Sequence, residues 1–230
     1  MKTIGMVGGT GPETTVDYYQ RIIALYREKS GDNFPSILIN SVNARPMIAS
    51  LNVGQLGNVT ELMVGALEKL AKGGADFAVI AANTPHIVFD DIRPRSALPL
   101  ISIVEAAAER AEELGMKKLG LLGTKFTMEG TFYHKVFSQH GIQLVVPEAD
   151  ERLYCHEKYM GELFYNVIRE DTRKDLAGIV SNMAERDGIE GVILGGTELS
   201  LIFREPTIAG LPVLDTAQIH VESIVREALK

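Results

Sequence analysis

The sequence has little cysteine, no long apolar run and no excess of positive charge, and each shortage argues against a class of protein. A single cysteine, Cys155, cannot form an internal disulfide, which fits a reducing compartment. No apolar run approaches the ~20 residues of a membrane-spanning helix, and no signal-peptide core follows Met1. The formal net charge of −7 disfavours nucleic acids and anionic membranes, because both bind basic surfaces. We therefore expect a cytoplasmic protein whose partner is a small molecule.

Spacings that hold metals or nucleotides are also missing. The five histidines are scattered, and no pair has the H-x-x-x-H spacing of a metal site. The glycine turn 8–11 resembles part of a dinucleotide motif, but Thr14 stands where G-x-G-x-x-G needs its third glycine. We expect neither a metal nor a nucleotide cofactor.

Short apolar runs alternate with helical patterns along the chain, which predicts a parallel α/β fold. Hydrophobic residues make up 46% of the chain and charged ones 23%, as in an ordinary globular protein of one large or two small domains. The predicted strands cover residues 3–7, 36–42, 76–82, 98–102, 118–123, 142–146, 191–195 and 211–215. The predicted helices cover residues 13–29, 60–72, 104–114, 127–140, 157–174, 175–186 and 216–229, and residues 43–58 are predicted to be irregular.

Three landmarks recur at a nearly constant offset. The strand and turn 4–8 match 119–123, Ala82 matches Gly196, and 98–100 match 211–213, at offsets of 115, 114 and 113 residues. This predicts a duplication, with two pseudo-symmetric domains, each a short, mostly parallel sheet flanked by helices. We expect the first domain to comprise residues 1–102 and 208–230 and the second to comprise 103–207, with a ligand cleft between them.

Polar side chains follow the third strand of each half, where parallel strands present residues at the edge of a sheet. Asn83 and Thr84 in the first half, and Thr197 in the second, suit a ligand carboxylate. Thr10 and Thr124, in the turns after the first strand of each half, are further candidates. Turn and N-cap hydrogen bonds within the chain would explain the same residue types.

The ordered set of motifs resembles the cofactor-independent aspartate/glutamate racemases of the Asp/Glu/hydantoin racemase superfamily. The resemblance covers essentially the whole chain. It rests on residues 4–10 with 13–15, on 82–86, on 122–124 with 126–128, on 147–152 and on 194–199. It implies two pseudo-twofold α/β domains, often as a homodimer, that hold an amino acid between them and act on its α-carbon without pyridoxal phosphate.

Resemblance to this family also implies a cysteine at the third-strand end of each half, one to remove the α-proton and one to return a proton to the opposite face. Here Ala82 and Gly196 occupy those two positions, and neither side chain can carry a proton. Cys155 lies outside both motifs, and a lone thiol is more often inert packing than a nucleophile.

The remaining candidates for proton transfer are Glu198, two residues after Gly196, and His86, four residues after Ala82. A buried Glu198 would have a raised pKa and would suit a single acid/base. A salt bridge for Glu198 and a capping role for His86 are equally acceptable explanations. Arg45 and Lys158 are the cations that we would examine for the distal carboxylate of aspartate or glutamate, with plain surface solvation as the alternative.

Two hypotheses follow from these residues. The first is an isomerase of the amino-acid racemase family, or a one-base lyase, that uses Glu198, His86 or a bound water. The second is a catalytically silent relative that still binds an amino acid. If Ala82 and Gly196 were engineered, they would be inactivating substitutions that trap the substrate.

Overall fold

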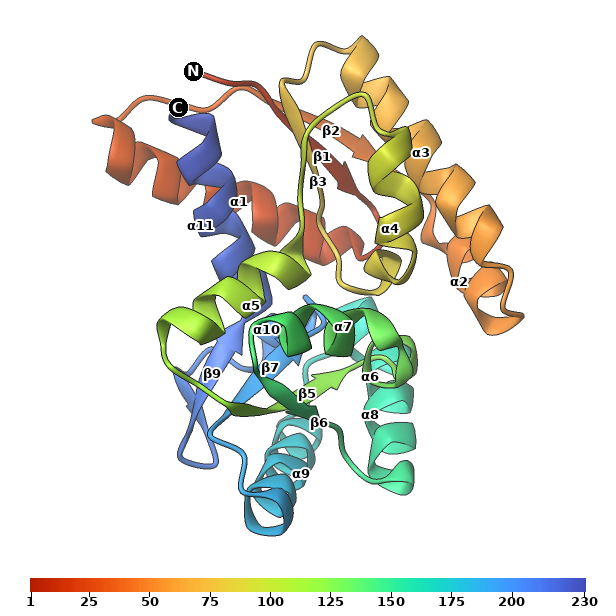
Figure 1. Ribbon diagram of the computed structural model, residues 1–230, viewed down its shortest axis with the longest axis vertical. Helices are drawn as coiled ribbons and strands as arrows, with labels where there is room; N and C mark the ends of the chain where they lie inside the picture. Colours follow the sequence, from red (N-terminus) through yellow and green to blue (C-terminus); the bar gives the residue numbers. More distant parts are fainter. The chain divides into compact units, whose positions relative to one another are not determined.

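The computed structural model describes all residues, 1–230, and its chain divides into two compact units. Met1–Ile103 and His220–Lys230 form the first unit, and Val104–Ile219 form the second. Figure 1 shows that each unit is built on its own sheet with helices against it, so this is an α/β protein with two mainly parallel sheets.

The sheet of the first unit has the strand order β2-β1-β3-β4 and is parallel throughout. Its central strands β1 and β3 are buried along their whole length, as expected of apolar runs that helices cover on both faces. The strands are β1 (Ile4–Gly8), β2 (Ile37–Ser41), β3 (Phe77–Ile80) and β4 (Leu100–Ile101). The helices are α1 (Pro12–Ser30), α2 (Ala44–Asn52), α3 (Leu56–Lys72), η1 (Thr84–Val88), α4 (Phe89–Ile92), η2 (Arg93–Arg95) and α11 (Thr216–Ala228), of which α11 begins in the second unit.

The sheet of the second unit has the order β6-β5-β7-β9-β8, in which only β8 is antiparallel to its neighbour. Its strands are β5 (Lys118–Gly123), β6 (Gln143–Val145), β7 (Gly191–Gly195), β8 (Thr207–Ile208) and β9 (Leu211–Asp215). Its helices are α5 (Ile103–Glu113), α6 (Lys125–Glu129), α7 (Thr131–Gln139), α8 (Ala149–Gly161), η3 (Leu163–Tyr165), α9 (Glu170–Asp187) and α10 (Leu199–Ile202).

The two sheets share one strand order when β1, β2, β3 and β4 are matched with β5, β6, β7 and β9. In both, the first strand of the half lies between the second and the third, and the fourth lies beyond the third. The shared strand order supports the two similar halves that the repeated landmarks predicted.

Among the differences from the sequence expectations, three concern whole segments of the chain. Residues 208–219 belong to the second unit, not the first, because β9 pairs with β7 along Val213 and Leu214. The stretch 43–58 is largely helical rather than irregular, since Asn43 caps α2 by accepting a hydrogen bond from the Arg45 N–H at 3.0 Å. Helix α8 begins at residue 149 rather than 157 and ends at 161, before a short 3-10 turn.

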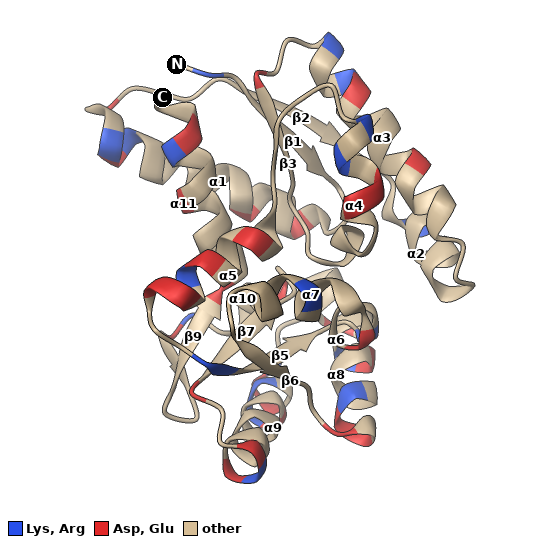
Figure 2. Ribbon diagram, viewed as in Figure 1, with Lys and Arg blue, Asp and Glu red and all other residues tan.

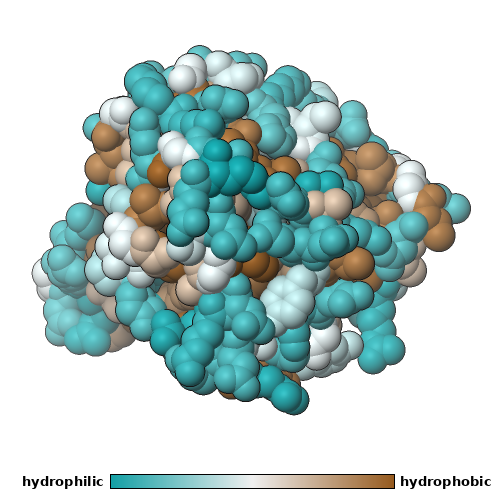
Figure 3. Space-filling view, turned by 90° about the horizontal axis from the view of Figure 1, so that it is seen from below, coloured by the Kyte–Doolittle hydropathy of each residue, from teal (hydrophilic) through white to brown (hydrophobic).

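The face drawn in Figure 3 is mixed rather than dominated by one patch. Charged residues lie on the helices, in loops and at the ends of strands, which leaves the middle of each sheet uncharged (Figure 2). Hydrophilic side chains predominate in the view of Figure 3, where the apolar ones form separate patches. None of the helices has both the length and the apolar character that a bilayer crossing requires. The expected homodimer stays a prediction.

Candidate functional site

The glycine turn after β1 is a tight turn that only glycine allows at its second position. Gly9 has φ +84°, and a Cβ atom there would lie 2.2 Å from the carbonyl oxygen of Val42, just beyond β2. The Gly9 N–H donates to the Thr15 hydroxyl at 2.8 Å, and that hydroxyl donates to the Gly11 carbonyl at 2.9 Å. The turn is therefore held by the close approach of Val42 and by the Thr15 hydroxyl. Thr10 lies between the two glycines that this hydroxyl bridges.

The Thr10 side chain is buried without a hydrogen bond. Only 7% of the residue is exposed, and its Oγ1 atom has no partner in the structure. It lies next to the start of α1, where Gly11 is the N-cap and provides no side-chain acceptor. Because an unpaired buried hydroxyl costs ~1–3 kcal/mol, this atom and the uncapped helix start form a place where a ligand oxygen would be favourable.

Ala82 and Asn83 follow β3 and are both buried, with 8% and 2% of their surface exposed. Ala82 turns the chain, because its N–H donates to the Ile80 carbonyl at 2.8 Å. Thr84 then starts η1 and is partly buried. The predicted binding residues Thr10, Asn83 and Thr84 thus follow two neighbouring parallel strands, β1 and β3, at the same edge of the first sheet.

His86 uses both ring nitrogens within the protein. Its Nδ1 lies 2.9 Å from the Ala82 carbonyl oxygen, which can only accept, so Nδ1 carries the proton and Nε2 accepts from the Ile103 N–H at 3.4 Å. The ring also stacks on Phe89, with centroids 4.7 Å apart. Burial, with a smaller contribution from the nearby His220, lowers the pKa of His86 to about 3. The imidazole is neutral at physiological pH and holds the Ala82 turn in place.

Thr124 occupies the position in the second unit that Thr10 has in the first, but its hydroxyl is occupied. It caps α6 by accepting a hydrogen bond from the Thr127 N–H at 3.3 Å. The Thr124 and Thr127 hydroxyls are also 3.3 Å apart. The two turns therefore differ in chemistry, and Thr10 is the better ligand candidate.

Tyr159 fills the space beside Gly196. A Cβ atom on Gly196 would lie 2.4 Å from Cε2 of Tyr159 and 2.7 Å from its hydroxyl oxygen, which is closer than real contacts allow. Tyr159 projects from α8 and is only 6% exposed. The Tyr159 phenol, which comes from α8, therefore occupies the volume that a side chain on residue 196 would need.

Glu198 receives the hydrogen bond of that phenol. Its Oε2 accepts from the Tyr159 hydroxyl and from the Thr197 hydroxyl, the latter at 3.0 Å, and the residue is 3% exposed. Burial raises the pKa of the Glu198 carboxyl, and the hydrogen bond from Tyr159 opposes part of that rise. Burial and the adjacent carboxyl hold the pKa of the Tyr159 phenol well above its usual value. The pair is therefore a buried carboxyl group that accepts a hydrogen bond from a buried phenol.

Tyr159 is the residue of this cluster that the sequence did not reveal. Its only signal was the glycine at 196, since a missing side chain at a buried strand end must be compensated by another. Cys155, four residues earlier on α8, is 4% exposed, and burial raises the pKa of its thiol to about 12. The thiol stays protonated at neutral pH, as expected of a packing residue.

The two candidate cations differ in whether their charged groups already have partners within the protein. Lys158 donates to Glu162 at 2.7 Å and lies over the ring of Tyr154 at 5.6 Å, so it is already neutralised. Arg45 is exposed at the start of α2, and its guanidinium makes no hydrogen bond or ion pair.

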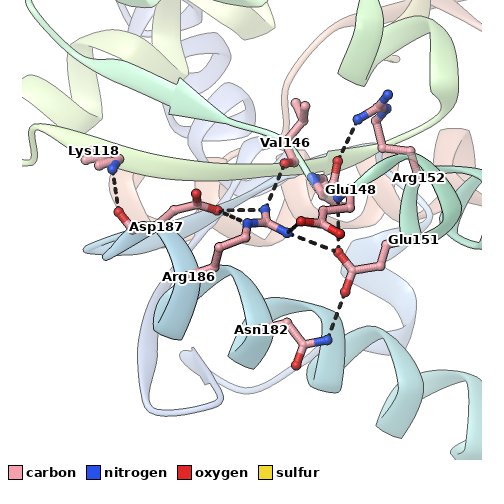
Figure 4. Close-up of polar contacts among 9 residues, drawn as sticks. Lys118, Val146, Glu148, Glu151, Arg152, Asn182, Arg186 and Asp187 are labelled. Atoms are coloured by element: carbon pink, nitrogen blue, oxygen red, sulfur yellow. Dashed lines mark hydrogen bonds and ion pairs between the residues drawn. The ribbon is translucent and has the colours of Figure 1, made fainter.

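The acidic stretch after β6 anchors α8 to α9. Glu148 and Glu151 form a capping box at the start of α8, and Arg186 lies 3.3 Å from Glu148 and 3.7 Å from Glu151 (Figure 4). Asn182 donates to Glu151 at 2.8 Å, and Arg152 donates to the carbonyl of the preceding loop at 2.7 Å. These contacts fix the helix that carries Tyr159.

The model of the Asp/Glu/hydantoin racemase family matches residues 7–224, which extends through both units. The chain belongs to this family. A curated relative of this racemase-family protein is RacX, a broad specificity amino-acid racemase of Bacillus subtilis strain 168, at 27% identity over 146 residues. That match covers 62% of this chain and 63% of RacX, slightly less than two thirds of the relative's length.

Two solved structures resemble this racemase-family protein over the full length of both chains. A candidate Asp/Glu racemase from Yersinia pestis has a TM-score of 0.88 at 31% identity, covering 100% of each chain. An aspartate racemase homologue from Pyrococcus horikoshii OT3 has a TM-score of 0.84 at 35% identity, again with 100% of each chain covered.

Proposed function

We propose that this protein binds aspartate or glutamate and exchanges the proton on the α-carbon with a single acid/base, without pyridoxal phosphate, a metal or a nucleotide. Membership of the racemase family supports an amino acid as the ligand, and the likeness to RacX supports a free amino acid. The residues around Thr10 and Glu198 support the two halves of the proposal, binding and proton transfer.

The observation that carries the binding is the unpaired hydroxyl of Thr10. A buried polar atom without a partner is rare in folded proteins, and here it adjoins the uncapped start of a long helix. A carboxylate oxygen would accept the hydroxyl proton and benefit from the partial positive charge of the helix N-terminus. We assign the α-carboxylate of the amino acid to this place.

The other contacts are assigned by residue type and position. Asn83, Thr84 and Thr197 offer short polar side chains at strand ends for the carboxylate and ammonium groups, and Thr124 has a lesser part because it caps α6. For the distal carboxylate we favour Arg45, whose guanidinium has no partner, over Lys158, which is bound to Glu162.

Proton transfer falls to Glu198 rather than to His86. Burial raises the pKa of the Glu198 carboxyl, so it is a stronger base than an exposed glutamate and is better suited to accept and return a proton. His86 is held neutral with both nitrogens hydrogen-bonded, and Ala82 offers no acid/base at all. With an acid/base in one half only, we expect α-proton exchange on one face of the carbon to be faster than racemisation. Elimination would begin with the same proton abstraction.

A silent amino-acid-binding relative is the second candidate. The observation that favours it is the lack of a thiol at Ala82 and Gly196, the third-strand ends of the two halves, since the loss of a general acid/base typically costs ~10²–10⁴ in rate. Such a protein would still bind the amino-acid carboxylate at the Thr10 hydroxyl but would not transfer a proton.

Incubation with L-aspartate or L-glutamate in D₂O separates the two. The α-proton signal in the ¹H NMR spectrum should disappear with saturation kinetics, while chiral analysis shows slower formation of the D-enantiomer. Saturable binding by calorimetry without any exchange would favour the silent relative. If the protein showed neither binding nor exchange, both proposals would be rejected for these two amino acids.

A further inference from the structure

We propose that the Tyr159 phenol is the group that exchanges the proton with the substrate α-carbon, with Glu198 as the proton acceptor behind it. This inference rests on the proposed function, and it adds a catalytic residue from α8, outside both strand-end motifs. Tyr159 and Glu198 both belong to the second unit.

The first step is the position of the phenol. Its oxygen lies 2.7 Å from the place of a Cβ atom on Gly196, and Cε2 lies 2.4 Å from it. A thiol on residue 196 would place its sulfur one bond beyond that Cβ atom, in the volume that the ring and hydroxyl now fill. The phenolic oxygen is thus the polar atom that stands in for a reactive side chain at residue 196.

The second step is the fixation of the ring. Tyr159 belongs to the apolar core between α8, α9 and β7, which includes Cys155, Val180 and Leu194. The start of α8 is tied to the end of α9 through Glu148, Glu151 and Arg186 (Figure 4). A buried ring on an anchored helix keeps its hydroxyl in one place, which proton transfer to carbon requires.

The third step is the path of the protons. The α-proton of the substrate moves to the phenolic oxygen as the phenol proton moves to Oε2 of Glu198, along the hydrogen bond already present. The C–H electron pair stays on the α-carbon, which becomes the carbanion, and the Glu198 carboxylate becomes a neutral acid. The phenol is regenerated, so no free tyrosinate forms, and the reverse movement returns a proton to the same face. Thr197, which also donates to Oε2, keeps the carboxylate oriented.

The buried setting is consistent with this path. Burial raises the pKa of the Glu198 carboxyl, which makes it a stronger base than an exposed glutamate. Because the pKa of Tyr159 is well above its usual value, the phenol retains its own proton unless a proton arrives from elsewhere. The pair therefore acts as one acid/base, in which the proton passes through the phenolic oxygen of Tyr159 and Oε2 of Glu198 in turn.

The test compares Tyr159→Phe with a matched control on the same helix, Tyr154→Phe, which removes a phenol that is hydrogen-bonded to Asp175 rather than to Glu198. The readout is α-proton exchange of L-aspartate and of L-glutamate in D₂O, with saturation curves for each protein. We expect Tyr159→Phe to lower the maximal exchange rate by about 100-fold or more while the half-saturating concentration stays unchanged. Tyr154→Phe should behave as the wild type. Thermal unfolding of both variants checks that they are folded.

Glu198→Gln gives an independent measure, because the amide can still accept the phenol hydrogen bond but cannot take up a proton. Its loss of rate should match that of Tyr159→Phe, and the double variant should lose no more than either single one, since the two groups act as a unit. The pH dependence of exchange should lose its acidic limb in Glu198→Gln.

The outcomes separate this inference from the proposed function. If Tyr159→Phe exchanged the α-proton at the wild-type rate, the role of Tyr159 would be overturned and the proposed function would stand. A loss in Tyr159→Phe that shows only in the half-saturating concentration would likewise make the phenol a packing or binding group. No exchange of either amino acid by the wild type would overturn both.

Discussion

The ring of Tyr159 stands where a side chain on residue 196 would begin, with its Cε2 atom 2.4 Å from the position of a Gly196 Cβ. The two residues are therefore coupled, because a larger residue at 196 requires a smaller one at 159. This relationship means that the absence of cysteine at residue 196 is built into the packing of α8 against β7.

Gly196→Cys alone should be destabilising. Overpacking of a buried site typically costs ~1–3 kcal/mol of unfolding free energy, and the clash here is with a ring in an anchored helix. Tyr159→Ala alone should also destabilise, because it leaves a cavity. The combined variant should be more stable than the sum of both costs predicts, by ~0.5–3 kcal/mol, because the new side chain enters the vacated space. Urea denaturation of the four proteins measures this, and strictly additive costs would contradict the coupling.

Cys155 should be unreactive in the folded protein. Burial raises the pKa of its thiol to about 12, so the thiolate that reacts with iodoacetamide is scarce at neutral pH. Mass spectrometry should show no alkylation of the native wild type and one alkylated site after denaturation in guanidinium chloride. The Cys155→Ala variant should keep any exchange activity, and rapid labelling of native protein would refute the packing role.

Thr10→Val should separate stability from binding. The change removes a hydroxyl that has no partner, so the apoprotein should be as stable as the wild type or more stable, by about 1 kcal/mol. Binding of the amino acid should weaken by about 10- to 150-fold, as for a lost hydrogen bond of ~1.5–3 kcal/mol to a charged group. Thermal unfolding and calorimetry measure the two effects.

Thr124→Val is the matched control for that experiment. Its hydroxyl caps α6, so the substitution should lower stability and leave binding largely intact. If Thr10→Val destabilised the apoprotein as much as Thr124→Val does, the Thr10 hydroxyl would have a structural partner and the binding assignment would be lost.

Acid should destabilise the first unit through two buried histidines. Burial lowers the pKa of His220 to about 4, and burial together with His220 lowers that of His86 to about 3. Unfolded histidines bind protons near pH ~6.5, so below that pH the unfolded state holds more protons and stability falls as pH falls. The slope should approach ~1.4 kcal/mol per pH unit for each histidine, from about pH 6.5 down to the folded-state values.

His220→Gln tests that slope. The ring accepts from Tyr18 and donates to the Ile101 carbonyl, both at 3.1 Å, and an amide can offer the same donor and acceptor without titrating. Urea midpoints at neutral pH and at about pH 5 should differ less in the variant than in the wild type. An unchanged pH dependence would show that His220 is not the group that titrates.

Much of the fold was predictable from local patterns. Buried parallel strands are short apolar runs that end in small residues, so β1, β3, β5 and β7 were located from the sequence, as was their repetition. Helix ends were less predictable: α8 starts earlier than its apolar pattern suggested, because the capping box at Glu148 and a network with Arg186 stabilise its first turn.

The sequence by itself determined the family, the alternation of strands and helices, and the absence of a thiol at Ala82 and Gly196. Only the tertiary structure decided that residues 208–219 join the second sheet, that the Thr10 hydroxyl has no partner, and that Tyr159 fills the space at Gly196. The physical reason is that hydrophobic periodicity is a property of neighbouring residues. Hydrogen-bond satisfaction and side-chain volume instead depend on segments that only folding brings together, such as Tyr159 and Glu198, which are 39 positions apart in the chain.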